Sequence, residues 1–307
     1  QFSIDGEVYA LPMWYEEFED LGWYYEGDPD LKLASEDYDY DVFEKDGVEL
    51  WVDVTNYSIN ATKVKDCIVT GVEFDGYDLD DDTVIKFAKD IQLEVSTPDD
   101  IIAAYGEPSD IYEGSYRTYY YYYPGDDYYY YQEITFSFDN ETGIFDRAEF
   151  SNEVEEIDGF DNTLNLERPD FLDNYEAPTA LSDDIYGTEI SVDGDIYTLP
   201  CPVTEFYKNG YELQYYYDED YLPAGQTYYC SLVKEGKELS VHIKNFSDYA
   251  TSFDNCYVVS VSYDSEYHGD IAYETAGGIT IGMTEDELVA AFGDLENSLY
   301  ESDEQNY

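Results

Sequence analysis

The chain has 307 residues, with 73 Asp and Glu against 13 Lys and Arg, which gives a formal net charge of -60. Such a surface repels nucleic-acid phosphates and anionic lipids, so electrostatic binding to DNA, RNA or membranes is excluded. Because 43% of the residues are hydrophobic and 38 are Tyr, the chain can bury cores and is not a disordered acidic segment.

The sequence indicates a secreted protein. It contains no run of 18 apolar residues that could span a membrane, and it starts at Gln1 with no charged-then-apolar leader. We interpret this as a mature product from which a signal peptide has been removed. The acidity is typical of a solvated, salt-tolerant surface, with specific cation binding as the alternative.

The front half of the chain occurs twice. Residues 3–12 and 191–200 share six of ten positions, and Asp5-Gly6 and Asp193-Gly194 predict tight β-hairpin turns. A shared Leu-Pro then leads into a short helical segment, which we expect to end at Gly22 and Gly210. Second hairpins follow, turning at residues 46–47 and 235–236.

The strongest repeat joins residues 56–75 to residues 245–264. Eight of the twenty positions are identical without a gap, which indicates duplication. Each copy runs from an Asn-aromatic-Ser turn, through a cysteine, into an alternating apolar strand.

The back half begins near residue 90 in the first copy. Thr97 and Thr284 are predicted to cap helices that bear an apolar stripe and end at Gly106 and Gly293. In the first copy a meander follows, with strands predicted at about 116–123, 128–139 and 144–151. The second copy has only residues 294–307 there, so we expect its sheet to be completed by further chain or by a neighbouring subunit.

These patterns predict an α+β protein of two duplicated modules, each mainly antiparallel sheet with a short helix and a helix-then-meander unit. The first module covers residues 1–151 and the second, without its meander, residues 188–307. Residues 152–187 are acidic, contain Pro169 and Pro178, and are interpreted as a linker.

The Thr-x-x-Asp/Glu helix that ends in Tyr/Phe-Gly, followed by aromatic strands, resembles the SmpA/OmlA and β-lactamase-inhibitor-protein-like fold. The second copy carries that family's Gly-Met-Thr at residues 282–284, whereas the first has Glu-Val-Ser at 94–96. The front half is similar to repeats in secreted and surface proteins of anaerobic Gram-positive bacteria that have no assigned activity. The resemblance implies secretion, and binding or assembly in place of catalysis.

The cysteines differ between the copies. Cys67 aligns with Cys256, and both are expected to be buried core thiols. Cys201 and Cys230 occur together in the second copy and are absent together from the first, which predicts a disulfide between them.

No catalytic signature is present, and we expect no enzyme: the chain has two His and no Gly-x-Ser-x-Gly, P-loop or GxGxxG sequence. No cofactor is expected apart from a weak candidate calcium site in one acidic loop, where a solvated loop is the alternative; its residues are Asp78, Asp80, Asp81 and Asp82. Candidate glycosylation sites are Asn56, Asn60, Asn140 and Asn245, although a turn that requires Asn explains the equivalent pair Asn56 and Asn245 equally well.

The most specific feature is a tyrosine hairpin. Its candidate binding or assembly residues are Tyr119, Tyr120, Tyr121, Tyr122, Tyr123, Tyr128, Tyr129, Tyr130 and Tyr131. Alternate strand residues point to opposite faces, so both faces are aromatic, and the helix stripe at Ile101, Ile102 and Tyr105 can cover only one. The other face is predicted to be a contact surface unless the linker or the second module covers it.

The first hypothesis for the function is therefore a subunit of a surface layer or filament. The alternative is a secreted module that binds carbohydrate or a protein on tyrosine platforms.

Overall fold

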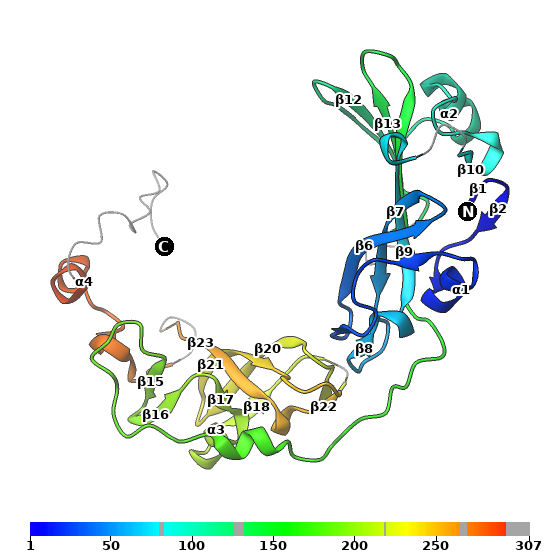
Figure 1. Ribbon diagram of the computed structural model, residues 1–307. Coiled ribbons are helices and arrows are strands. Elements are labelled where there is room, and N and C mark those ends of the chain that lie inside the picture. Colours follow the sequence, from blue (N-terminus) through cyan, green and yellow to red (C-terminus); the bar gives the residue numbers. More distant parts are fainter. Residues whose placement is uncertain (80–82, 126–131, 218, 265–268, 293–307) are drawn as a thin grey trace. The chain divides into compact units, whose positions relative to one another are not determined.

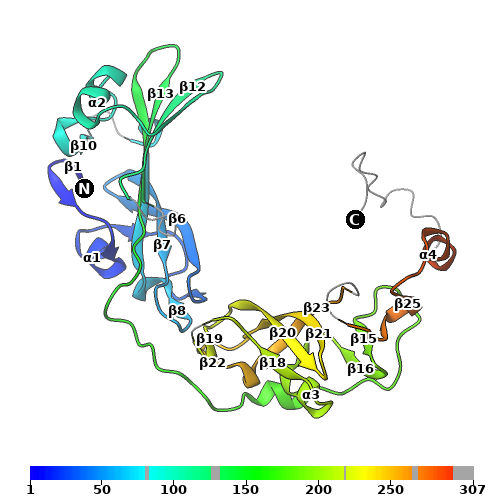
Figure 2. The same ribbon diagram turned by 180° about the vertical axis from the view of Figure 1, so that it is seen from behind.

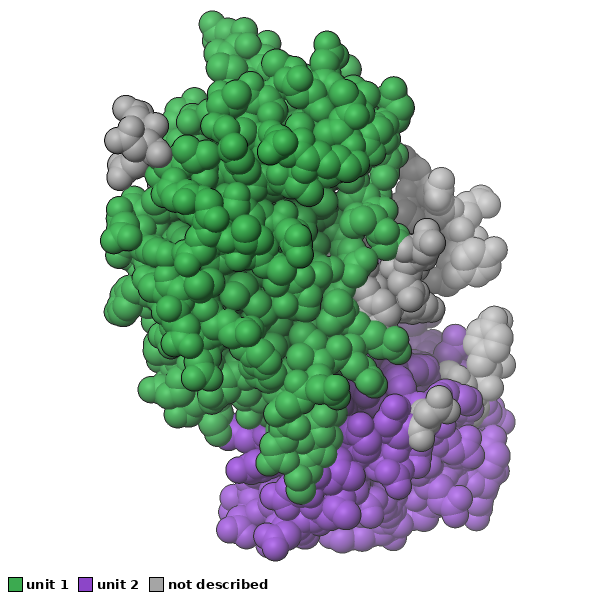
Figure 3. Space-filling model, turned by 90° about the vertical axis from the view of Figure 1, so that its right-hand side faces the viewer, with its two compact units in different colours: residues 1–163 green, residues 164–307 purple. Residues whose placement is uncertain are grey.

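The computed structural model describes residues 1–79, 83–125, 132–217, 219–264 and 269–292. The chain divides into two compact units, residues 1–163 and residues 164–307 (Figure 3). The strands pair antiparallel and the helices are short, which confirms the predicted α+β class.

Unit 1 is built on one nine-stranded sheet. Its order is β11 (Asp110–Glu113), β12 (Arg117–Tyr122), β13 (Gln132–Asp139), β14 (Phe145–Asn152), β9 (Ile68–Asp75), β7 (Val48–Thr55), β6 (Tyr38–Lys45) and β4 (Tyr24–Tyr25), with β3 (Met13–Trp14) also pairing with β9. A three-stranded sheet joins β10 (Ile85–Phe87), β1 (Phe2–Ile4) and β2 (Glu7–Tyr9), and a small pair joins β5 (Lys32–Leu33) to β8 (Thr62–Lys63).

The helices and the small sheet of unit 1 lie on the same side of the large sheet. Figures 1 and 2 both show α1 (Tyr15–Asp20), α2 (Pro98–Tyr105), β1 and β10 together on that side. The core lies between these layers and is rich in aromatic rings: Phe18, Phe74 and Phe136 are fully buried. The opposite side of the sheet carries no helix of the described part of unit 1. Short 3-10 turns complete the unit at η1 (Val64–Asp66), η2 (Gly76–Asp78) and η3 (Ala88–Asp90).

The local signals of the sequence are confirmed. Asp5 and Gly6 have φ angles of 51° and 87°, as a tight hairpin between β1 and β2 requires. Thr97 caps α2 by accepting from the Asp100 amide at 3.3 Å, and Asp100 accepts in return from the Thr97 amide at 2.9 Å. Ile101 in the same helix is fully buried.

The meander differs from its prediction in one respect. Strands β12, β13 and β14 lie near the expected ranges, but the additional strand β11 pairs with β12 at the edge of the sheet. Strand β14 pairs with β9, so that the meander and the front half of the module form one continuous sheet.

From its first hairpin to α4, the described part of unit 2 follows the order of elements that unit 1 has from β1 to α2. Its five-stranded sheet runs β17 (Cys201–Pro202), β23 (Tyr257–Ser262), β21 (Lys237–Lys244), β20 (Thr227–Lys234) and β18 (Glu212–Gln214). A second sheet runs β16 (Asp195–Thr198), β15 (Glu189–Val192), β24 (Tyr273–Thr275) and β25 (Ile279–Thr280), and a small pair joins β19 (Tyr221–Leu222) to β22 (Thr251–Ser252). The helical segments are η4 (Asp170–Asn174), α3 (Val203–Lys208), η5 (Phe253–Asn255), η6 (Ala276–Gly278) and α4 (Glu285–Phe292).

The helix α4 differs from its counterpart α2 in its packing. Thr284 forms the predicted capping box with Glu287, whose carboxylate accepts from the Thr284 amide at 2.8 Å. Leu288 and Val289 are only half-buried and do not join the core of unit 2, whereas Ile101 of α2 is central to the core of unit 1.

None of the helices in the described part of the chain is long and apolar enough to cross a membrane.

The segment predicted as a linker is held to both units. On the unit 1 side, the Asn60 amide donates to the Asp161 carbonyl oxygen at 2.7 Å. On the unit 2 side, the Thr251 hydroxyl donates to the Asn165 carbonyl oxygen at 2.7 Å. The division between the units therefore lies inside residues 152–187, and most of this segment belongs to one unit or the other.

Candidate functional site

The tyrosines of β12 are sorted between the two faces of the sheet. Tyr120 packs edge-on against Phe138 at a centroid distance of 4.8 Å, and Tyr122 packs edge-on against Phe136 at 5.8 Å, so both point to the core. The Tyr122 hydroxyl also donates to the Gly106 carbonyl oxygen at 2.9 Å, which ties β12 to the end of α2.

The alternate tyrosines form a ladder on the face without a helix. Tyr119 and Tyr121 stack at a centroid distance of 6.3 Å, and Tyr121 and Tyr123 stack at 6.4 Å. Tyr112 of β11 continues the ladder, with its ring 6.0 Å from that of Tyr119. We call these four residues the tyrosine ladder. Tyr128, Tyr129, Tyr130 and Tyr131 lie outside the described residues.

A polar groove lies beside the tyrosine ladder. Its cavity is about 190 Å³ and is lined by residues of β9, β12, β13 and β14: Glu73, Tyr119, Tyr121, Thr135, Ser137, Arg147, Ala148 and Glu149. The floor is unusually well covered for a sheet face, since Thr135 is 6% and Ser137 is 1% exposed.

The register of the strands explains how the groove is assembled. Tyr121 lies opposite Thr135, and Thr135 lies opposite Glu149. This row continues across β9 and β7 through Glu73 to Trp51. Side chains at paired positions of neighbouring strands share a face, so five strands contribute to one surface.

A second aromatic pair stands at the other end of this row. Tyr40 of β6 stacks on Trp51 with centroids 5.1 Å apart, and the Tyr40 hydroxyl donates to the Glu73 carboxylate at 2.8 Å. Both rings are more than a third exposed. The polar groove is thus bordered by aromatic rings on both sides.

The charges in the groove are mostly negative. Arg147 donates to Asp75 and lies 3.5 Å from the Glu73 carboxylate. Burial, together with the charges of Glu133, Glu73 and Asp53, raises the pKa of Glu149. Arg117 donates to the Ser137 hydroxyl beside the groove, but it is paired with Asp146. Because carboxylates outnumber the cations here, the groove repels anionic ligands.

Asp53 is the most perturbed carboxyl group of this face. Its side chain lies over Gly71, where an added Cβ would be 2.1 Å from the Asp53 Oδ2. Burial, followed by the charges of Glu153 and Glu73, raises the pKa of Asp53 to about 6. A glycine at position 71 is what leaves room for this carboxylate against the sheet.

The prediction of a disulfide between Cys201 and Cys230 is wrong. All four cysteines are free and buried. Cys201 lies on β17 and Cys230 on β20, with β23 and β21 between them in the sheet. Strands lie about 4.8 Å apart, so these residues are beyond the Cα separation of about 4.4–6.8 Å that a disulfide spans. Cys67 and Cys256 are core thiols as expected, and burial raises the pKa of each to about 12.

Three of the four candidate glycosylation sites are structural asparagines. The Asn245 side-chain amide donates to the carbonyl oxygens of Leu222, Pro223 and Tyr249, at 3.0, 3.1 and 2.8 Å. Asn56 does the same with Leu33, Ala34 and Asn60, and both side chains are buried. A glycan on such a nitrogen would break these bonds, so the turn is the correct explanation for Asn56 and Asn245.

The other two sequons differ from each other. Asn60 is 8% exposed and donates to carbonyl oxygens of residues 161 and 163, so it too serves the fold. Asn140 is exposed, and it stays a candidate.

The calcium site stays a prediction. Asp80, Asp81 and Asp82 lie outside the described residues, and Asp78 ends the short turn η2. No group of three or more His, Cys, Asp or Glu side chains suited to a metal ion occurs within the described ranges.

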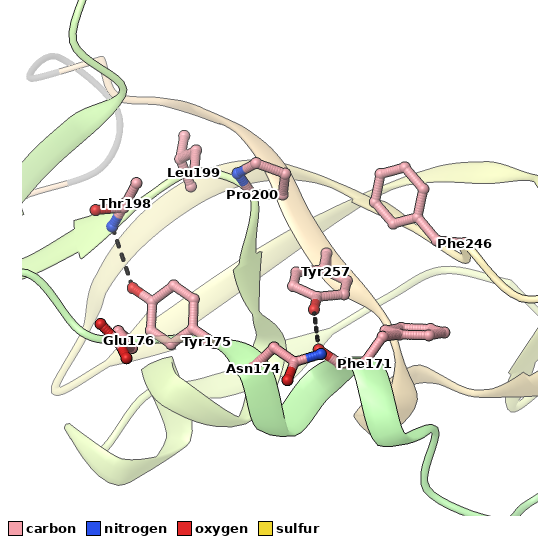
Figure 4. Close-up of a pocket in the computed structure, with 9 residues that line it drawn as sticks. All are labelled: Phe171, Asn174, Tyr175, Glu176, Thr198, Leu199, Pro200, Phe246 and Tyr257. Atoms are coloured by element: carbon pink, nitrogen blue, oxygen red, sulfur yellow. Dashed lines mark hydrogen bonds between the residues drawn. The ribbon is translucent and has the colours of Figure 1, made fainter.

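Unit 2 presents a different kind of opening. A cavity of about 490 Å³ lies between η4, the Leu199–Pro200 turn and the start of β23, and its lining is mostly apolar and aromatic (Figure 4). Phe171 stacks on Tyr257 at 5.9 Å, and the Tyr257 hydroxyl donates to the Phe171 carbonyl oxygen at 3.1 Å. The Tyr175 hydroxyl accepts from the Thr198 amide at 3.1 Å.

Sequence reasoning identified the tyrosines of β12 but missed their partners. Tyr40, Trp51 and Tyr112 lie on the same face, and Arg147 and Glu149 lie between the two aromatic groups. The alternation of residues along β6 and β7 predicts strands, but it does not predict that the meander joins the same sheet.

Comparison with known proteins adds no relative, because no family model, curated protein or solved structure matches the chain.

Proposed function

We propose that the chain is an extracellular binding protein, with no catalytic role, whose polar groove and tyrosine ladder hold a neutral carbohydrate chain. The observation that carries the proposal is the sheet face without a helix in the described part of unit 1, on which stacked tyrosines border a groove lined by hydroxyl and carboxylate groups.

The chemistry of the face favours a sugar over other ligands. Tyrosine rings offer apolar surface together with a hydroxyl group that can exchange hydrogen bonds with a ligand. Carboxylates such as Glu149 accept hydrogen bonds from sugar hydroxyls, while their charge opposes polyanions.

The test is binding of the full chain to insoluble polysaccharides and to a glycan array. A Tyr119→Ala/Tyr121→Ala variant should lose binding by a factor of ten or more. A matched double variant, Tyr186→Ala/Tyr216→Ala, removes two exposed tyrosines of unit 2 and should bind as the original chain does. Unchanged binding by the Tyr119/Tyr121 variant, with an unchanged melting temperature, would contradict the proposal.

Assembly into a surface layer or filament is the second candidate. The observation that favours it is β11, whose four residues are all exposed and which, among the described strands, pairs with β12 alone. Such an edge can pair with a second chain. Negative-stain microscopy should then show polymers, whose formation strengthens with salt or millimolar Ca²⁺ because repulsion between chains of net charge -60 is screened. Dispersed particles under all of these conditions favour the binding protein.

A further inference from the structure

The two units differ at one edge of their central sheets. In unit 1, β9 has β7 on one edge and β14 on the other, with residues 71–75 paired to residues 147–151. In unit 2, the counterpart β23 pairs with β21 on one edge and with β17 at its start. Residues 260–262, the counterparts of 71–73, have no strand on the second edge within the described part of unit 2.

The side chains beside this edge are correspondingly less covered. In unit 1, Val72 is 1% and Phe74 is 0% exposed; Phe150 and Ala148 of β14 lie opposite them, and the Phe74 ring also packs on Phe2 and Phe87. Their counterparts Val261 and Tyr263 are only half-buried, although they touch the core of unit 2. A strand at this edge would cover Val261 and Tyr263 further.

The last residue of β14 and the chain that follows it show where such a strand would lead. The Asn152 side-chain amide donates to the Leu11 carbonyl oxygen at 2.6 Å, and the Val154 amide donates to the Tyr57 hydroxyl at 3.2 Å. In unit 2, the counterparts of Leu11 and Tyr57 are Leu199 and Phe246.

These two counterparts line the cavity of Figure 4. Leu199 and Phe246 stand on its rim together with Pro200 and Tyr257. The cavity therefore lies where unit 1 seats the residues that follow its own strand. Phe246 has no hydroxyl group, so of the two bonds seen in unit 1 only the one to the Leu199 carbonyl oxygen has an acceptor here.

We propose that unit 2 is an acceptor for a peptide strand supplied by a partner polypeptide. The strand adds antiparallel to residues 260–262 of β23, and its tail enters the cavity of Figure 4. The partner segment has the chemistry of residues 145–154: large apolar or small side chains at alternate positions, then an Asn that donates to the Leu199 carbonyl oxygen. Neutral or basic residues occupy its outward positions, because the acceptor chain carries a net charge of -60.

A polypeptide fits this edge better than other ligands do. The open edge of a sheet offers backbone donors and acceptors at the spacing of a second strand, which neither a sugar nor a lipid reproduces. The internal repeat supplies the template, because β14 occupies the equivalent edge of β9.

The probe is a fluorescently labelled synthetic peptide with the sequence of residues 145–154, in which Glu149→Lys and Glu153→Lys remove the like charge. Titrated against the full chain, it should bind saturably. The control peptide adds Ala148→Pro, which removes one backbone donor while leaving the charge unchanged. The proposal requires that the control bind at least tenfold more weakly.

Two further measurements locate the binding. Hydrogen exchange should slow in residues 257–264 when the peptide is added, with no change in residues 68–75 of unit 1. Phe246→Ala should weaken binding about tenfold, whereas Tyr186→Ala, which removes an exposed ring elsewhere in unit 2, should not.

Several outcomes would overturn the proposal. Equal binding of both peptides would mean attraction by charge alone. Amides of residues 260–262 that do not bond to β21 should exchange fast without peptide, and slow exchange at these amides would mean that the edge is closed. Sedimentation then tells what closes the edge. A monomer means that the chain's own residues occupy it, and a larger particle means that a second copy does.

Discussion

At the scale of single residues, the sheet face that bears the groove holds carboxylates in positions that disfavour their charge. Asp53 is placed against the sheet by the space over Gly71, and its neighbours Glu73 and Glu153 are also acidic. Its pKa in the folded chain, about 6, is above the ordinary value of 3.8. A group that binds its proton more tightly when folded stabilises the fold at low pH and loses that contribution as pH rises.

We therefore expect Asp53→Asn to change how stability depends on pH. Between pH 4 and 6, the unfolding free energy contributed by Asp53 should fall as pH rises, because the folded state must give up a proton that the unfolded state has already released. The Asp53→Asn variant lacks this loss. Its unfolding free energy, relative to that of the original chain, should therefore rise by on the order of 1–2 kcal/mol between pH 4 and pH 7.

The measurement is urea denaturation of both proteins at several pH values. Asp46→Asn, in the exposed turn between β6 and β7, is the matched control and should follow the original chain. Parallel curves for Asp53→Asn and the original chain would show that Asp53 is well solvated.

At the scale of elements, the sequence predicted what depends on neighbours along the chain. The turn at Asp5-Gly6 and the cap at Thr97 each need only a few adjacent residues, and both form as predicted. The sorting of the β12 tyrosines between two faces follows from the alternation of a strand.

What sequence could not predict depends on distant pairing. The joining of β14 to β9 brings together residues such as Phe150 and Val72, and no local pattern encodes that choice. Strand β11 has exposed residues throughout and therefore lacks the alternation by which strands are recognised. The disulfide prediction was wrong for the same reason, since the joint absence of Cys201 and Cys230 from one copy does not determine the order of their strands in the sheet. The role of Asn245 stayed open because the same residues satisfy both a turn that requires Asn and a glycosylation sequon.

The two faces of β12 should respond differently to substitution. Tyr122→Ala removes a ring that packs on Phe136 and Tyr105 and a hydroxyl that bonds Gly106, so we expect a loss of about 2–3 kcal/mol of stability. Tyr119→Ala removes a ladder ring on the uncovered face and should cost less than about 1 kcal/mol. Chemical denaturation measures both. Equal losses would mean that the ladder is itself part of a core.

At the scale of the whole molecule, each unit carries its own core and its own copy of the asparagine turn. The two clusters of buried apolar residues share no member. In each unit one buried Asn amide binds three carbonyl oxygens of the surrounding loops, which explains why this residue is identical in both copies. The duplication thus preserves the features that build a module, while residues on the sheet face that bears the groove differ: Asp53 corresponds to His242, and Trp51 to Ser240.

Separate cores predict separate unfolding. Asn245→Ala leaves three carbonyl oxygens without their donor and should cost about 2–3 kcal/mol, a fall on the order of 5–10 °C in the melting of unit 2. Asn56→Ala should do the same to unit 1. In calorimetry each variant should move one of two transitions and leave the other in place, whereas Asn174→Ala, at an exposed position of unit 2, should move neither. If Asn245→Ala or Asn56→Ala shifts both transitions equally, the two units unfold cooperatively. Their unfolding is then coupled through the segment 152–187.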